Sequence, residues 1–77
     1  MKKELVIVVP YNEINKIEYA LDFIVHSKIV DSMFIEVSHI DTFLSSLKIT
    51  IECEREIVID RIFGSLEEEY LHFHNYV

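Results

Sequence analysis

Glycine, proline and cysteine each occur once in these 77 residues, and each scarcity excludes a class of site. Cys53 has no second cysteine, so neither an internal disulfide nor a zinc site built from several thiolates is available. Gly64 stands alone, so the chain has no glycine-rich loop of the kind that cradles phosphate groups. The stability of the fold must come from packing and association.

Long apolar runs are also missing. The longest uninterrupted ones, Leu5–Val9 and Phe23–Val25, are much shorter than the roughly 20 residues that span a bilayer. A signal peptide needs an apolar stretch of about 7 to 15 residues, and here the first run stops at Pro10. We therefore expect a cytoplasmic protein without a membrane partner.

Cations are few, because 7 lysines and arginines stand against 14 acidic residues and the formal net charge is −7. From Ile49 onward the acids outnumber Arg55 and Arg61, the cations of that part, so the C-terminal part is the acidic one. Contacts to phosphate supply much of the affinity for nucleic acids, so we expect no direct nucleic-acid binding. An acidic surface suits a basic protein partner, and it also suits a solvated face that keeps the domain soluble.

Apolar residues, by contrast, are abundant and make up 51% of a sequence that is long enough for one domain. A domain this short buries only about 60% of the surface that its unfolded chain exposes. More hydrophobic surface is present than a lone domain of this size hides easily. We therefore expect a partner to cover the remainder.

Hydrophobic spacing predicts the order strand, helix, strand, strand, helix in one α+β domain that covers residues 1–77. Alternation with a period of two predicts the strands, and apolar positions three and four residues apart predict the helices. The expected strands cover residues 4–9, 33–38 and 47–53, and the expected helices run from Asn12, as N-cap, to about Lys28 and from Arg55 to about His74.

This order determines the sheet. A right-handed crossover through the first helix, followed by a hairpin, places the third strand between the other two and both helices on one face. The result is a three-stranded antiparallel sheet in the order 1-3-2, a ferredoxin-like layout without its fourth strand. The first strand is then an unpaired hydrophobic edge, which is a template for pairing. We expect a dimer with a second copy or a paralogue, formed by edge pairing or by the open sheet face, with an interface at Leu5, Val6, Ile7, Val8 and Val9.

Side chains that could carry catalysis or bind a metal are present but poorly arranged. His72 and His74 are two residues apart on the expected helix and point to different sides of it, so they make a poor chelating pair. Cys53 alternates with apolar residues of its strand and is expected to be a small core hydrophobe. We therefore expect no catalytic residues, no cofactor, no metal site and no enzyme activity.

Gly64 within the second helix is the strongest local anomaly, because an interior glycine costs roughly 1 kcal/mol relative to alanine. Close packing of that helix inside the domain would explain the glycine, and so would a flat spot where a partner helix approaches. We expect the outer faces of the two helices to bind a larger protein. The residues expected at that contact are Tyr19, Phe23, Phe63, Gly64 and Tyr70.

The strand and helix order and the segments 48–52 and 59–66 resemble the small Pcc-type subunit of the KEOPS complex over nearly the whole chain. The positions that match the family's helical pattern are Ile59, Ser65 and Leu66. Gly64 stands where that pattern has Asn, and Asp60 where it has Arg. The resemblance implies a non-catalytic dimerising subunit whose helices pack against the ATPase of KEOPS, which makes threonylcarbamoyladenosine in tRNA. The chain would then serve tRNA processing through its partner, as a standard subunit or an acidic paralogue.

Two other functions stay open at this point. One is an acidic inhibitor, of a phage-encoded type, that occupies the basic groove of a nucleic-acid enzyme. It needs an acidic stripe across the surface, and the lysines of the first two thirds of the chain partly neutralise that part. The other is a small ligand-binding regulatory domain of the ACT type. Such domains share the open ferredoxin-like layout but generally have a fourth strand and a glycine-containing ligand loop.

Overall fold

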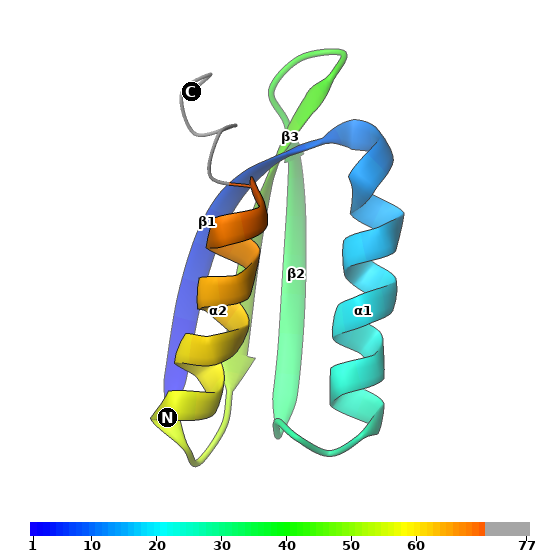
Figure 1. The fold of residues 1–77 in the computed structure, drawn as a ribbon. Helices are drawn as coiled ribbons and strands as arrows, with labels where there is room; N and C mark the ends of the chain where they lie inside the picture. Colours follow the sequence, from blue (N-terminus) through cyan, green and yellow to red (C-terminus); the bar gives the residue numbers. More distant parts are fainter. Residues whose placement is uncertain (71–77) are drawn as a thin grey trace.

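The structure, a computed structural model, describes residues 1–70 as one sheet with two helices against it (Figure 1). Its elements are β1 (Lys2–Pro10), the 3-10 helix η1 (Tyr11–Glu13), α1 (Ile14–His26), β2 (Ser32–His39), β3 (Leu44–Glu52) and α2 (Glu56–Tyr70). The strands lie in the order β1-β3-β2, and both pairings are antiparallel. The predicted α+β class, element order and sheet order are thus confirmed. The expected helix end near His74, and with it His72, lies outside the described residues.

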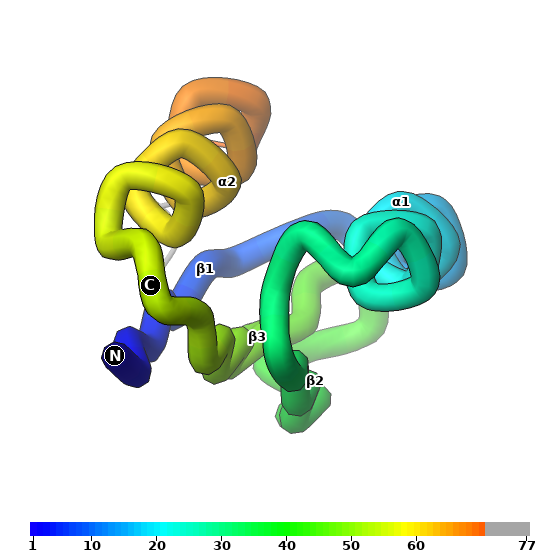
Figure 2. Tube along the Cα trace, turned by 90° about the horizontal axis from the view of Figure 1, so that it is seen from below, coloured from blue at the N-terminus to red at the C-terminus, as the bar shows by residue number. Residues whose placement is uncertain are grey.

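Both helices cover the same face of the sheet and stand apart from each other (Figure 2). In both views α2 lies on the β1 side of that face and α1 on the β2 side. Two ion pairs tie α2 to the start of β1, since Nζ of Lys3 lies 2.6 Å from Oε1 of Glu56 and 2.9 Å from Oδ1 of Asp60. The hydrogen bonds that Lys3 donates to Glu56 and Asp60 raise its pKa above the ordinary 10.5.

The core lies between the helices and the sheet. Alternate residues of each strand point into it, and the central strand β3 contributes the fully buried Leu47, Ile49 and Ile51. Cys53 continues this register beyond the strand and is also buried. The helices add Ile14, Ile17 and Leu21 from α1 and Ile59, Phe63 and Tyr70 from α2.

The ends of α1 differ from the prediction. Asn12 does not cap the helix, because it lies in η1, and α1 begins at Ile14 without a side-chain cap hydrogen bond. At the other end, the amide of Lys28 donates to the carbonyl of Val25, and Lys28 has a φ of 60°. This left-handed conformation ends many helices, and α1 therefore stops at His26, before the expected end near Lys28.

The connection between β2 and β3 is shorter than predicted, because Asp41 organises it. Oδ1 of Asp41 accepts hydrogen bonds from the amides of Phe43 and Leu44, at 2.7 and 2.8 Å. Such a side-chain turn replaces part of a longer loop. As a result β3 begins at Leu44, ahead of the predicted start at Leu47.

Candidate interaction surfaces

Groups suited to catalysis or metal binding do not gather into a site within residues 1–70. No three side chains of His, Cys, Asp or Glu stand together there as possible metal ligands. Cys53 is buried, and its Sγ donates a 3.6 Å hydrogen bond to the carbonyl of Ile29. Nδ1 of His39 lies 3.4 Å from Oγ of Ser45, a contact that the sequence did not predict. Ser45 is fully buried, so its hydroxyl has no access to a substrate. None of the described helices is long and apolar enough to cross a membrane.

The outer edge of β1 is open. The amide of Cys53 donates to the carbonyl of Met1, and the amide of Tyr11 donates to the carbonyl of Phe43. In an antiparallel pair, hydrogen-bonded residues alternate with residues whose backbone groups point the other way, so the odd-numbered residues of β1 face β3. The outward backbone groups belong to Lys2, Glu4, Val6 and Val8. Among the described residues no strand pairs with them.

Little in the centre of this edge prevents another strand from adding to it. Natural edges are blocked by proline, by bulges or by charges that point inward. β1 has such features only near its ends, where Lys3 reaches α2 and Pro10 closes the strand. Between them the register with β3 runs without a bulge, and the side chain of Val6 is 55% exposed. The part of β1 around Glu4 and Val6 is thus available for strand pairing, whereas Val8 is only 4% exposed.

The five residues expected at the dimer interface differ in accessibility. Ile7 and Val9 are fully buried, and Leu5 packs against the same core. Val8 is also buried, which leaves Val6 as the exposed side chain of the set. A contact at this strand would therefore be made by its backbone and, among the side chains, mainly by Val6.

Gly64 lies on the side of α2 that overlooks the β1 edge. The residues of α2 that face the core are Ile59, Phe63 and Tyr70, and those that face the space beside α1 are Arg61, Ile62, Ser65, Leu66 and Glu69. Helical spacing places Gly64 on neither of these faces but on the side away from α1. A Cβ added to Gly64 would meet no atom within 4 Å. Of the two explanations for this glycine, close packing inside the domain is therefore excluded, and Gly64 is a flat exposed spot.

The predicted partner-binding residues fall into two groups. Tyr19 and Phe23 on α1 are 81% and 68% exposed, so they are available for contact. The prediction that Phe63 and Tyr70 face outward is wrong, because they are 7% and 3% exposed and pack in the core. α2 is apolar on more than one side, and its position over β1 selects the face that carries these two rings. Burial, with a smaller effect of nearby carboxylates, raises the pKa of Tyr70 to about 12.

A groove of about 370 Å³ lies between α1 and α2. Ala20 and Ile24 line it from α1, and Ile62 and Leu66 line it from α2. The side chains of Ile24, Ile62 and Leu66 are half-buried, so their outer parts form an apolar floor. A helix laid into such a groove would cover apolar side chains of both walls, in the mode by which amphipathic helices bind many proteins.

The open face of the sheet is mostly polar. Nζ of Lys48 lies 3.7 Å from Oε1 of Glu4, and Glu36 stands opposite Lys48 on β2. Among residues 1–70, the large apolar side chains exposed on this face from within the strands are Val6 and Phe34. A face with this alternation of charge suits water better than a dry interface between sheets. Edge pairing is therefore the better route to a dimer.

Comparison with known proteins adds no family to this description, because no family model, curated protein or solved structure matches the chain. The resemblance to the Pcc-type subunit of KEOPS therefore stays a prediction. The molecule has three open surfaces within residues 1–70: the edge of β1 with the Gly64 side of α2, the groove between the helices, and the second strand edge at β2. Sequence reasoning missed that second edge, although the order 1-3-2 leaves a strand edge on each side.

Proposed function

We propose that this chain is a non-catalytic assembly subunit, which pairs through the outer edge of β1 and offers its helices to a larger protein. The observation that carries the proposal is the open stretch of β1 at Glu4 and Val6, whose backbone groups point outward and which are both exposed. An open edge of this kind adds another strand through main-chain hydrogen bonds. A second copy or a paralogue supplies an equally open strand, so it is the partner of choice.

The strand limits how two copies would pair, because only its even-numbered residues point outward. In a two-fold symmetric antiparallel arrangement with Glu4 opposite the partner's Val6, the outward amide of each of these residues finds a carbonyl. The two sheets become one, with all helices on the same face. The two α2 helices then lie side by side and meet along the side that carries Gly64 and the exposed Ile57. A glycine without close neighbours in its own chain is suited to such an approach.

The larger partner is proposed to bind the helices on the side away from the sheet. The groove between α1 and α2 takes a helix, and the exposed rings of Tyr19 and Phe23 extend the contact on α1. The resemblance to the Pcc-type subunit gives the proposal its specific form. In that form the larger partner is the ATPase of KEOPS, and the chemistry of tRNA modification belongs to the ATPase.

The proposal is tested by light scattering, which gives the absolute mass of the chain across a concentration series. The wild type is expected to exceed the 9.1 kDa of a monomer. Val6→Pro removes an outward amide that β3 does not use, so the variant should keep its fold and lose the dimer. Val6→Thr, a β-branched control, should still pair. A wild type that stays monomeric at every concentration would contradict the pairing.

The larger partner is tested by adding a KEOPS ATPase subunit, with and without a standard Pcc-type subunit. A species whose mass includes this chain supports the KEOPS form of the proposal. Introducing Ala20→Arg should weaken that complex without changing the fold, because Ala20 is exposed in the groove. If neither subunit binds the chain, the KEOPS form is wrong, while the mass series decides separately on pairing.

A further inference from the structure

The outer edge of β2 is a second open strand edge, on the other side of the sheet from β1. The amide of Ile40 donates to the carbonyl of Leu44, which sets the even-numbered residues of β2 toward β3. The backbone groups of Met33, Ile35 and Val37 therefore point outward. Within residues 1–70 no strand pairs with them.

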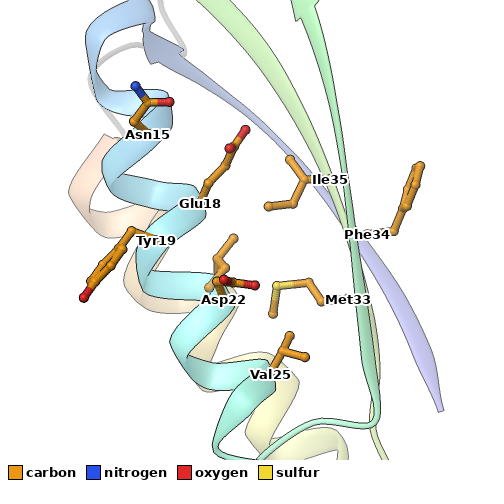
Figure 3. Close-up of a pocket in the computed structure, with 9 residues that line it drawn as sticks. Asn15, Glu18, Tyr19, Asp22, Val25, Met33, Phe34 and Ile35 are labelled. Carbon is orange, nitrogen blue, oxygen red and sulfur yellow. The ribbon is translucent and has the colours of Figure 1, made fainter.

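A groove of about 550 Å³ runs beside this edge, between β2 and α1. α1 lies over the helix-covered face at the β2 end of the sheet (Figures 1 and 2). Met33 and Ile35 point from β2 toward α1, while Phe34 points to the opposite side of the strand (Figure 3). A strand added to β2 would thus place alternate side chains into the groove, over Met33 and Ile35, and the others onto the open sheet face beside Phe34.

The rim of this groove is negative. Glu18 and Asp22 line it from α1, and none of the described residues that line it is a lysine or an arginine. Glu18 has no ion pair with any described residue, and Asp22 has only His26, whose Nδ1 lies 3.8 Å from Oδ1 of Asp22. Both carboxylates thus remain available to cations of a bound molecule.

We propose that the groove between α1 and β2 binds an extended segment of another protein that carries Lys or Arg at alternate positions. Glu18 and Asp22 are four residues apart on a helix, which separates them by about 6 Å along its axis. Alternate side chains of a strand are about 6.8 Å apart, so two cations on one side of the segment meet the two carboxylates. Their aliphatic stems lie over Met33 and Ile35, and an apolar residue between them covers Phe34, which is 62% exposed.

A second copy of this chain fits the groove less well than a basic segment does. β2 itself, Ser32–His39, contains no lysine or arginine. β1 has Lys2 and Lys3 at adjacent positions, so they point to opposite faces of the strand. Neither strand offers cations at alternate positions. The occupant is therefore a separate basic partner, and its binding does not depend on pairing through β1.

The test uses a fluorescently labelled peptide in which Lys and Val alternate, with three Lys, measured by anisotropy against the intact chain. Glu18→Gln with Asp22→Asn should weaken binding about fivefold, as expected for the loss of two exposed ion pairs. Glu67→Gln with Glu68→Gln removes the same charge from the exposed surface of α2 and should change binding less than twofold. Equal weakening by both double variants would overturn the proposal, because it would show attraction to net charge alone.

Amide shifts in a two-dimensional NMR titration locate the peptide independently. The amides of Met33, Ile35 and Val37 should shift, and those of Glu4 and Val6 should not. Shifts confined to β1 or to the groove between the helices would overturn the assignment of the site. Light scattering without peptide tests whether a second copy occupies the edge of β2 instead. If the mass doubles, and Val37→Pro restores the monomer while Val6→Pro does not, a second copy binds at β2 and the proposal is overturned.

Discussion

Replacing Gly64 by alanine should stabilise the isolated chain and at the same time weaken its self-association. Gly64 sits inside α2, the structure gives it no positive φ, and a Cβ built on it meets no atom within 4 Å. Alanine is favoured over glycine in a helix interior by about 1 kcal/mol. For a domain of this size that gain corresponds to a rise of roughly 4 to 8 °C in Tm. In the proposed dimer the same methyl group lies between two α2 helices. Overpacking of that kind costs about 1 to 3 kcal/mol, which raises the dimer Kd about 5- to 150-fold.

The two effects are measured separately. Urea unfolding at a protein concentration well below the dimer Kd gives the free energy of the monomer, and sedimentation equilibrium gives the Kd. Ser65→Ala is the matched control, since Ser65 is exposed on the same helix but faces the groove beside α1. It should stabilise by a few tenths of a kcal/mol and leave the Kd unchanged. A destabilised Gly64→Ala monomer would refute the open environment of Gly64, and an unchanged Kd would refute the pairing of the α2 helices.

Three further predictions follow from the burial and electrostatics of single residues. Phe63→Ala should lower the free energy of unfolding by about 3 to 5 kcal/mol, and Phe23→Ala by less than about 0.5 kcal/mol, because the ring of Phe63 is in the core and that of Phe23 is exposed. Chemical denaturation compares the two variants, and equal losses would contradict the assigned helix faces. Stability should fall as the pH rises from about 10 to about 12, because the folded chain retains the phenol proton of Tyr70 where the unfolded chain loses it. The raised pKa of Lys3 acts in the same direction, since the stabilisation by its ion pairs is present below pH 10.5 and is lost as the amine deprotonates. Tyr70→Phe should reduce the loss of stability at high pH, and a variant with the wild-type pH profile of stability would contradict the role of Tyr70. The buried Cys53 should react with a thiol reagent only as fast as the chain opens, so its labelling should slow when the fold is stabilised. Fast labelling of the native protein would contradict the burial of Cys53.

The sequence was sufficient for the topology, because topology depends on coarse features. The alternation at Leu47, Ile49 and Ile51 gives the inward face of a strand, and a right-handed crossover followed by a hairpin predicts the order 1-3-2 that the sheet has. The sequence was insufficient for predicting where helices and strands begin and end, because these ends depend on single contacts. The side-chain turn of Asp41 brings forward the start of β3, and the left-handed Lys28 ends α1 early.

The helix faces could not be predicted for a different reason. α2 is apolar on more than one side, so its spacing fits either Val58 and Ile62 or Ile59 and Phe63 as the buried set. The position of α2 over the sheet, which the spacing does not give, buries Ile59 and Phe63 and leaves Val58 and Ile62 partly buried. The open edge of β2 follows from the predicted order 1-3-2 and was overlooked, whereas the groove beside it depends on where α1 lies over the sheet, which alternation does not give.

Amide hydrogen exchange along β1 tests the central claim, that the open edge of this strand is the pairing site, most directly. In a monomer, Leu5 and Ile7 are protected by their hydrogen bonds to β3, whereas the outward amides of the exposed Glu4 and Val6 exchange freely. We expect the amides of Glu4 and Val6 to become protected as the concentration rises into the range where the mass doubles. If these amides still exchange freely in a sample of doubled mass, or if the mass never doubles, β1 is not the interface.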